Sequence, residues 1–370
     1  MRAHSGAFDV PGLDGLRAVS VLLVFFSHAD PTSRNSLGNF GVTVFFFLSG
    51  YLITTLLRLE GERTGRISLG NFYLRRALRI LPPMYAVLAA AIILTLAGVL
   101  PGTISAGGVA IQAIHFTNYF VIVAGWSEVV TGTAAFWSLA VEEHFYLLFP
   151  FGYILLRRYA ADAARQAAVI LTLCAAVLVW RLVLFLNLGA TADRIYAGTD
   201  TRIDAILFGC FLAVFANPAL SPTRIGPAWW KRLLIPVAVM GILASFLIRQ
   251  PWFQETFRYS LQSLALYPIF VVAIRDPGWL PIRFLTFPVM RTIGNLSYVL
   301  YLVHGAIIDA TRAHVTAHPV IQAALALVVS FAVATAIHLL IERPSAGLRH
   351  KLASVHRSSG SDRTSTAATA

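Results

Sequence analysis

Long apolar stretches, broken by a few polar residues, dominate this chain. Ten of them approach or reach the length of about 20 residues that a helix needs to cross a bilayer core. They cover residues 13–29, 39–57, 83–100, 137–156, 167–189, 203–217, 232–248, 258–274, 293–310 and 320–341. The pattern predicts an all-α polytopic membrane protein, with about ten transmembrane helices around a polar chamber.

Composition and charge support the same class. Apolar residues make up 57% of the chain and charged residues 12%, with a mean hydropathy of +0.72, far from the soluble average. If the N-terminus is cytoplasmic, the inner loops collect most of the Lys and Arg residues, so the positive-inside rule predicts that both termini are cytoplasmic. The net charge of +12 therefore reflects topology, and no nucleic-acid partner is expected.

Two segments lie outside the ten spans. The apolar stretch 108–125 could be an eleventh span, but that would move the basic pair Arg157 and Arg158 to the outer side. We therefore expect a re-entrant or interfacial element that faces outward. The membrane domain is expected to cover 9–344, and the small polar residues of 345–370 predict a disordered cytoplasmic tail.

The first predicted helix contains two ionisable residues on nearly one face, in the segment DGLRAVSVLLVFFSH. Arg17 and His28 are eleven positions apart, which is roughly 16 Å along a helix. Ionisable groups inside a span are costly and indicate function. This helix is predicted to hold a cation near the cytoplasmic face and a titratable base toward the outer face.

Polar residues of three other predicted helices are expected at the depth of His28. We predict that Glu142, in FWSLAVEEHFYLLFP, orients His28 as a catalytic pair. The remaining candidates would line an acceptor pocket: Ser138, His144, Asp200, Arg202, Asp204, Asn295, Tyr301 and His304. A histidine at a helix end can also be a simple interfacial anchor, which accounts for His314 and His318.

A basic cluster in NFYLRRALRILPPMY lies on the predicted cytoplasmic side. Arg75, Arg76 and Arg79 carry guanidinium groups, which bind phosphate in a bidentate way. The prolines Pro82 and Pro83 are expected to end the helical pattern before the third span. The alternative is that this basic run only sets topology or contacts anionic lipids.

An ordered series of motifs resembles acyltransferase family three, whose members are integral membrane acyltransferases that modify sugars and other hydroxyl acceptors. The series is DGLRAVSVLLVFFSH, GVTVFFFLSGYLITTLL, FYLRRALRILPPMY, FWSLAVEEHFYLLFP, DTRIDAILFGCFLA, LSYVLYLVHGAII and IERP, and it covers about 9–344. The resemblance implies catalytic roles for His28 and Glu142 and donor-binding roles for Arg17, Arg75, Arg76 and Arg79. One departure is His144, where the family usually has glutamine.

The resemblance and the expected depths together predict an O-acyltransferase involved in polysaccharide modification. Acyl-CoA, most simply acetyl-CoA, would arrive from the cytoplasm, and a carbohydrate, glycolipid or glycosylated small molecule would accept the acyl group at the outer face. His28 would act as general base, although an acyl-histidine intermediate remains open. No metal is expected. The alternative is a proton-coupled secondary transporter, which the lack of an internal repeat disfavours.

Overall fold

The computed structural model describes residues 10–30, 36–222 and 225–347, and within these ranges it contains helices and no strand. Nine helices in the described ranges are long and apolar enough to cross a membrane. The prediction of an all-α polytopic membrane protein is confirmed. Of the predicted tail 345–370, residues 348–370 lie outside the described residues.

The long helices follow the predicted spans closely. They are α1 (Pro11–Ala29), α2 (Ser36–Thr64), α3 (Leu69–Leu96), α6 (Phe136–Tyr159), α7 (Ala163–Leu186), α9 (Thr199–Phe215), α11 (Ile235–Leu247), α12 (Arg258–Arg275), α13 (Pro288–His314) and α14 (Pro319–Ile337). Shorter elements extend or join them: α4 (Ala106–Ala113), α5 (Thr117–Ala124), η1 (Trp126–Glu128), α8 (Ala192–Ala197), α10 (Pro227–Trp229), η2 (Trp230–Leu234), η3 (Phe253–Phe257), η4 (Leu280–Thr286) and η5 (His338–Glu342).

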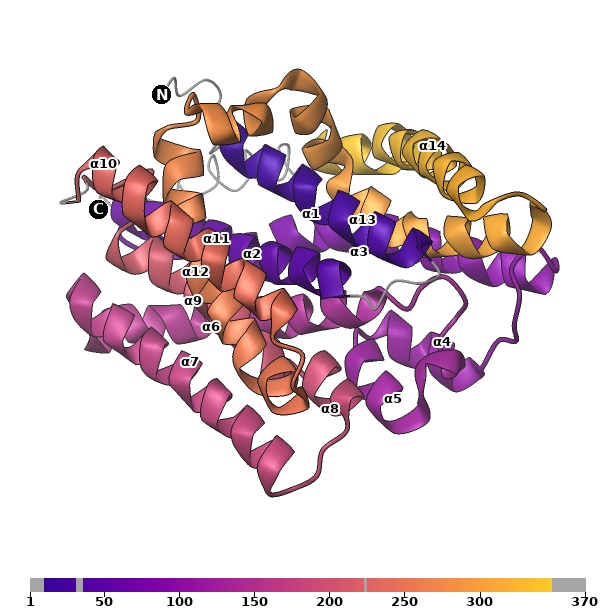
Figure 1. Cartoon of the computed structure of the whole chain (residues 1–370), viewed down its shortest axis with the longest axis horizontal. Coiled ribbons are helices and arrows are strands. Elements are labelled where there is room, and N and C mark those ends of the chain that lie inside the picture. Colours follow the sequence, from indigo (N-terminus) through magenta and orange to yellow (C-terminus); the bar gives the residue numbers. More distant parts are fainter. Residues whose placement is uncertain (1–9, 31–35, 223–224, 348–370) are drawn as a thin grey trace, which may run out of the picture.

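The short helix α9 is the most enclosed element of the bundle. Its 17 residues span about 26 Å, a little less than a bilayer core of about 30 Å. It packs against α2, α7 and α12, and most of its side chains are buried. In Figure 1, α9 lies in the interior, whereas α7 and α14 lie at opposite edges of the view.

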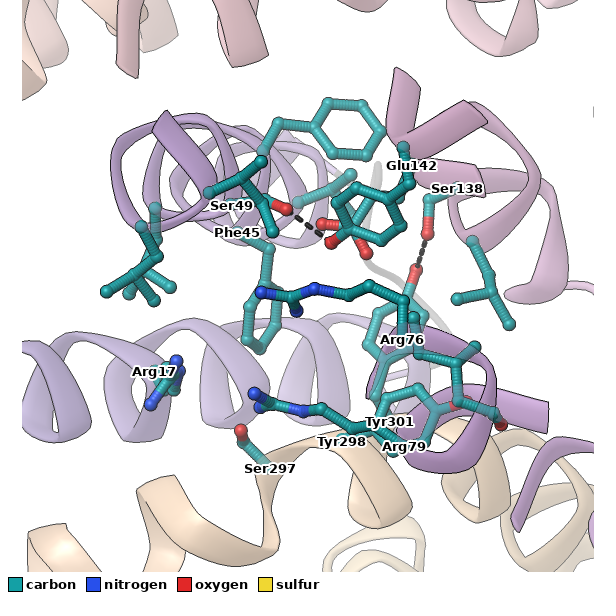
Figure 2. A pocket seen from close by; sticks show the side chains of 18 residues that line it. Arg17, Phe45, Ser49, Arg76, Arg79, Ser138, Glu142, Ser297, Tyr298 and Tyr301 are labelled. Carbon is teal, nitrogen blue, oxygen red and sulfur yellow. Dashed lines mark hydrogen bonds between the residues drawn. The ribbon is translucent and has the colours of Figure 1, made fainter. Parts of the chain in front are cut away.

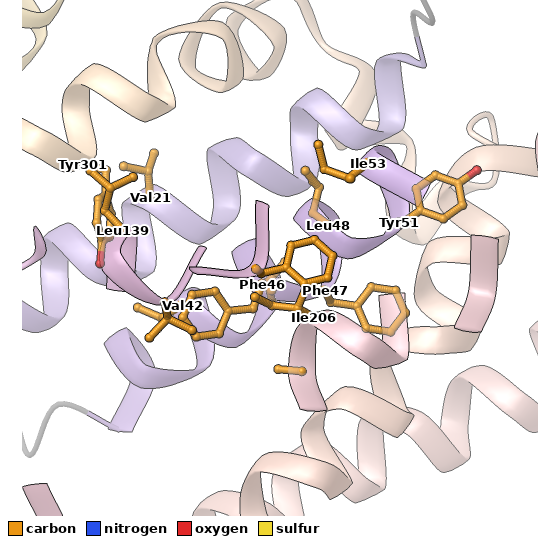
Figure 3. Close-up of a cluster of buried hydrophobic side chains, with 14 of the residues drawn as sticks. Val21, Val42, Phe46, Phe47, Leu48, Tyr51, Ile53, Leu139, Ile206 and Tyr301 are labelled. Carbon is orange, nitrogen blue, oxygen red and sulfur yellow. The ribbon is translucent and has the colours of Figure 1, made fainter. Parts of the chain in front are cut away.

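The contact between α2 and α9 depends on two glycines. A Cβ atom at Gly50 would lie 1.9 Å from the Ile206 carbonyl oxygen, and one at Gly209 would lie 1.9 Å from the Phe47 carbonyl oxygen. Glycine at both positions lets the two backbones approach each other, as in other membrane helix pairs. Aromatic and aliphatic side chains fill the adjacent space (Figure 3). The Phe47 and Phe270 rings are 4.5 Å apart.

The stretch 108–125 does not form an eleventh span. It contains α4 and α5, two helices of eight residues each, and each is only about 12 Å long. The helices are separated at His115, whose φ of 61° is unusual for a residue other than glycine. The second helix, α5, contacts α6, α8 and α4 (Figure 1).

The prediction that Pro82 and Pro83 end a helix is wrong. Both prolines lie inside α3, which continues to Leu96. Neighbouring helices stabilise this stretch, because Met84 is buried and the Tyr298 hydroxyl of α13 donates a hydrogen bond of 2.7 Å to the Ile80 carbonyl oxygen. Prolines are tolerated in membrane helices where a neighbour supplies such contacts. The basic cluster therefore belongs to a membrane helix.

The loop before α6 is fixed closely against α13. Gly132 has a φ of 78°, and a Cβ atom there would lie 2.2 Å from the Ala306 Cα atom. A Cβ atom at Gly305 would in turn lie 2.5 Å from the Gly132 carbonyl oxygen. The buried Gln112 side chain anchors the loop through Thr133, with an Nε2 to Oγ1 distance of 2.6 Å. This contact holds α13 at the turn that contains His304.

We expect the substitution Gly209→Ala to destabilise the protein by about 2 kcal/mol, because the new methyl group would push the α2 and α9 backbones apart. The free energy of unfolding, or the melting temperature in detergent, measures this. Gly152→Ala is the matched control, because no atom lies near its added Cβ, and it should stabilise α6 by up to about 1 kcal/mol. Equal melting temperatures for the two variants would contradict the close approach.

Candidate active site

A pocket of about 100 Å³ lies between α1, α2, α3, α6 and α13. Its polar lining consists of Arg17, Ser49, Arg76, Arg79, Ser138, Glu142, Tyr146, Ser297, Tyr298 and Tyr301. Figure 2 shows the guanidinium groups on one side of this pocket and the hydrogen bond between Ser138 and Tyr301 on the other. The pocket therefore has a cationic side and a hydroxyl-lined side.

Three arginines from two helices form the cationic side. Arg17 of α1 contacts the Asp14 carboxylate at 2.9 Å. Arg76 of α3 lies over the Tyr146 ring, with 5.3 Å between its Cζ atom and the ring centroid, and Arg79 follows one turn later. Glu142 supplies the one carboxylate among the lining residues. The lining thus carries more positive than negative charge, as an anion-binding pocket requires.

Two pairs of hydroxyl groups join the helices around the pocket. The Ser49 Oγ and Tyr146 hydroxyl oxygens are 2.5 Å apart and link α2 to α6. The Ser138 Oγ and Tyr301 hydroxyl oxygens are 2.6 Å apart and link α6 to α13. Each hydroxyl can both donate and accept hydrogen bonds. Each pair therefore forms its own hydrogen bond and keeps further hydrogen-bonding capacity for a polar ligand.

Two histidines lie next to the hydroxyl-lined side. The His28 Nδ1 and His304 Nε2 atoms are 2.8 Å apart. The rings are parallel within 2°, with centroids 5.0 Å apart, so they meet edge to edge in nearly one plane and do not stack face to face. The His304 Nδ1 atom lies 2.7 Å from the Tyr301 carbonyl oxygen. Tyr301 therefore contacts both the histidine pair and the pocket.

The partner of the His28 Nδ1 atom is His304, where Glu142 was predicted. Glu142 instead lines the pocket with the arginines. Depth along the helices suggested a common level for these residues but gave no information on how each helix is rotated. Among the described residues, no group of three His, Cys, Asp or Glu side chains could hold a metal ion.

Three predicted acceptor residues of α9 have other partners and do not line the pocket. Asp200 accepts hydrogen bonds from Arg194 and from the Trp180 Nε1 atom, the latter at 2.6 Å. Arg202 is fully buried, and its Cζ atom lies 4.1 Å from the Tyr259 ring centroid, a cation–π contact.

Asp204 and Arg181 form a bidentate ion pair of 2.9 and 2.7 Å, with both side chains fully buried. Ser260 also donates to the Asp204 carboxylate at 2.8 Å. The ion pair links α7 to α9. Asp204 thus stabilises the bundle, and its placement in an acceptor pocket is corrected.

Besides His28 and His304, three further predicted residues also lie outside the pocket lining. Arg75 is partly exposed and pairs with Glu60 at 3.0 Å. The His144 Nδ1 atom lies 2.8 Å from the Thr199 Oγ1 atom, with the Phe116 ring 4.7 Å away. Asn295 is exposed. Of the predicted arginines, Arg17, Arg76 and Arg79 are the ones that meet in the pocket.

Several lining residues were not predicted from the sequence. Tyr146 lies one helical turn after Glu142, and that i, i+4 spacing could have identified it. Ser297 and Tyr298 lie one turn before Tyr301 on α13. Ser49 offered no such signal, since its role depends on the packing of α2 against α6.

Comparisons with known proteins show the family of this chain. A family model described as an acyltransferase domain matches residues 10–339. The peptidoglycan O-acetyltransferase OatA of Listeria monocytogenes is 29% identical over 357 residues, which is 90% of this chain and 55% of the relative. The O-acetyltransferase OatA of Staphylococcus aureus is 31% identical over 312 residues, or 81% of this chain and 50% of the relative. The chain thus spans about half the length of these relatives, and no solved structure matches it.

Removal of one partner of the buried ion pair should destabilise the bundle strongly. We expect Asp204→Ala to cost about 3–5 kcal/mol, because it leaves the Arg181 charge buried and unpaired. The double variant Arg181→Met with Asp204→Leu should recover most of that loss. Thermal unfolding in detergent measures both. A double variant that folds normally but cannot bind an acceptor would instead support the predicted role of Asp204 in the acceptor pocket.

Proposed function

The chain belongs to acyltransferase family three, and from this premise we propose that it is a membrane O-acetyltransferase acting on a carbohydrate hydroxyl. Two relatives that match most of this chain carry the name O-acetyltransferase, which supports acetyl as the transferred group.

The proposed donor is acetyl-CoA, which binds from the cytoplasmic side. Its phosphate groups meet the guanidiniums of Arg17, Arg76 and Arg79, since arginine binds phosphate oxygens in a bidentate way. The distribution of Lys and Arg between the loops supports the cytoplasmic assignment of this side. Glu142 balances part of the positive charge while no donor is bound.

His28 is the proposed proton acceptor at the other end of the same helix. The roughly 16 Å between the Arg17 and His28 positions is comparable to the length of an extended pantetheine arm. The acceptor hydroxyl attacks the thioester carbonyl carbon while His28 takes its proton. A carbon–oxygen bond forms, the carbon–sulfur bond breaks, and the CoA thiolate leaves and recovers a proton from the imidazolium.

One observation carries this proposal. The cationic pocket and the histidine pair are adjacent, and Tyr301 contacts both: its side chain lines the pocket, and its carbonyl oxygen meets His304. An anion-binding group and a proton acceptor that one extended donor can reach together are what transfer from an anionic thioester requires.

The proposed acceptor is a carbohydrate at the outer face of the membrane. Peptidoglycan is named in the Listeria relative and is therefore the first acceptor to test. Short soluble glycan fragments with free hydroxyl groups are the matching probes for a purified enzyme.

We expect His28→Ala to lower kcat/KM for acetyl transfer by about 10²–10⁴-fold, which is the usual contribution of a general base. Purified protein in liposomes, supplied with acetyl-CoA and a glycan acceptor, allows release of the CoA thiol to be followed together with acetylation of the glycan. Retained binding of acetyl-CoA serves as the control for folding. Ion-driven uptake of the glycan without any release of CoA would instead support the transporter alternative.

Substitution of the pocket arginines should weaken donor binding selectively. We expect Arg79→Gln or Arg76→Gln to raise KM for acetyl-CoA by about 10- to 100-fold, the value of one or two charge-assisted hydrogen bonds. Arg75→Gln is the matched control on the same helix. Because Arg75 is partly exposed and paired with Glu60, its loss should change KM by about twofold or less. Equal effects at all three positions would show that only the general charge of α3 matters.

A further inference from the structure

The hydrogen bonds of His304 determine which of its ring nitrogens carries a proton. A backbone carbonyl oxygen can only accept a hydrogen bond, and the Tyr301 carbonyl oxygen lies 2.7 Å from the His304 Nδ1 atom. The His304 Nδ1 atom must therefore be the donor. In a neutral imidazole the other nitrogen, Nε2, then holds a lone pair and can only accept.

The same reasoning extends to His28. Its Nδ1 atom lies 2.8 Å from the His304 Nε2 atom, so Nδ1–H of His28 must be the donor of this bond. The His28 Nε2 atom is left without a proton. We infer that His304 is a positioning residue that holds His28 in its Nδ1–H tautomer, so that Nε2 of His28 is the proton acceptor. This inference rests on the proposed function.

Backbone contacts on α1 and on α13 hold the His28 and His304 pair in place. Arg312 donates hydrogen bonds to the carbonyl oxygens of His28 and Ala29, at 2.7 and 3.0 Å, and so fixes the end of α1 to α13. On the other side, Gly132 and Gly305 let the loop before α6 pack directly against the His304 turn. A positioning residue needs this kind of rigid support.

A neutral histidine suits this position for an energetic reason. His304 is 1% exposed, and a carboxylate so deeply buried would carry a large desolvation cost. Histidine supplies the acceptor lone pair with no charge. During transfer, Nε2 of His28 takes the hydroxyl proton and Nδ1–H continues to donate to His304, so the imidazolium keeps its orientation until the proton passes to the CoA thiolate.

Two substitutions separate positioning from packing. His304→Leu fills the site but cannot accept a hydrogen bond, so kcat should fall by about 100-fold or more while KM for acetyl-CoA is unchanged. His304→Gln can bring an amide oxygen to the place of Nε2, and kcat should return to within about tenfold of the unsubstituted protein. The control is His314→Leu at the end of the same helix, where kcat should not change.

A spectroscopic measurement tests the inference without any assay of activity. Nitrogen-15 NMR of histidine-labelled protein in liposomes, with the His28 signal assigned by its loss in His28→Ala, should show His28 protonated at Nδ1 and not at Nε2. In His304→Leu the signal should change to the Nε2–H tautomer.

An Nε2–H tautomer in the unsubstituted protein would overturn the inference whether or not the variants fold, as would a His304→Leu variant with normal kcat. The proposed function fails by a different result, namely undiminished transfer in His28→Ala.

Discussion

Hydrocarbon offers no hydrogen-bond partners, so every polar side chain inside this bundle must find its partner in the protein. The Arg181 and Asp204 pair meets that constraint by mutual neutralisation. The pocket meets it only in part. Arg17 pairs with Asp14 next to the pocket, but the lining itself contains three guanidiniums and one carboxylate. Such an excess of positive charge is unfavourable in a membrane and becomes favourable when an anionic ligand enters. The unbalanced pocket, and not the balanced ion pair, is therefore where function is expected.

The first helix places the two halves of the proposed chemistry at different depths. Arg17 lies in its first half and His28 in its last turn, and α13 crosses beside both, with Tyr298 and Tyr301 at the pocket and His304 at the imidazole. The contact between α1 and α13 thus fixes Arg17 and the proposed proton acceptor, and α3 adds Arg76 and Arg79 to the pocket. Preorganisation of this kind lowers the entropic cost of bringing reactants together.

Apolar length and charge distribution were sufficient to predict the long helices, and they singled out Arg17, Arg76 and Arg79, which meet in one pocket. They were insufficient to predict which side chains the polar residues of the helices contact. His28 contacts His304, which lies 276 positions away in the sequence. The position of Glu142 along its helix predicted a depth near that of His28, but it could not show which neighbouring helix the Glu142 side chain faces. Local rules failed at Pro82 and Pro83, because tertiary contacts on α3 outweigh helix propensity. What the sequence lacks is the rotation of each helix about its axis, which packing determines.

The central claim is that donor and acceptor approach from opposite sides of the membrane and meet beside His28. Sealed vesicles in which the loop between α2 and α3 faces a known side test it directly, with radiolabelled acetyl-CoA added on one side and a glycan acceptor enclosed on the other. The account predicts that the glycan is acetylated only when acetyl-CoA is supplied on the side of that loop, and that the released CoA stays on that side. Acetylation that occurs only when donor and acceptor share one side would contradict it.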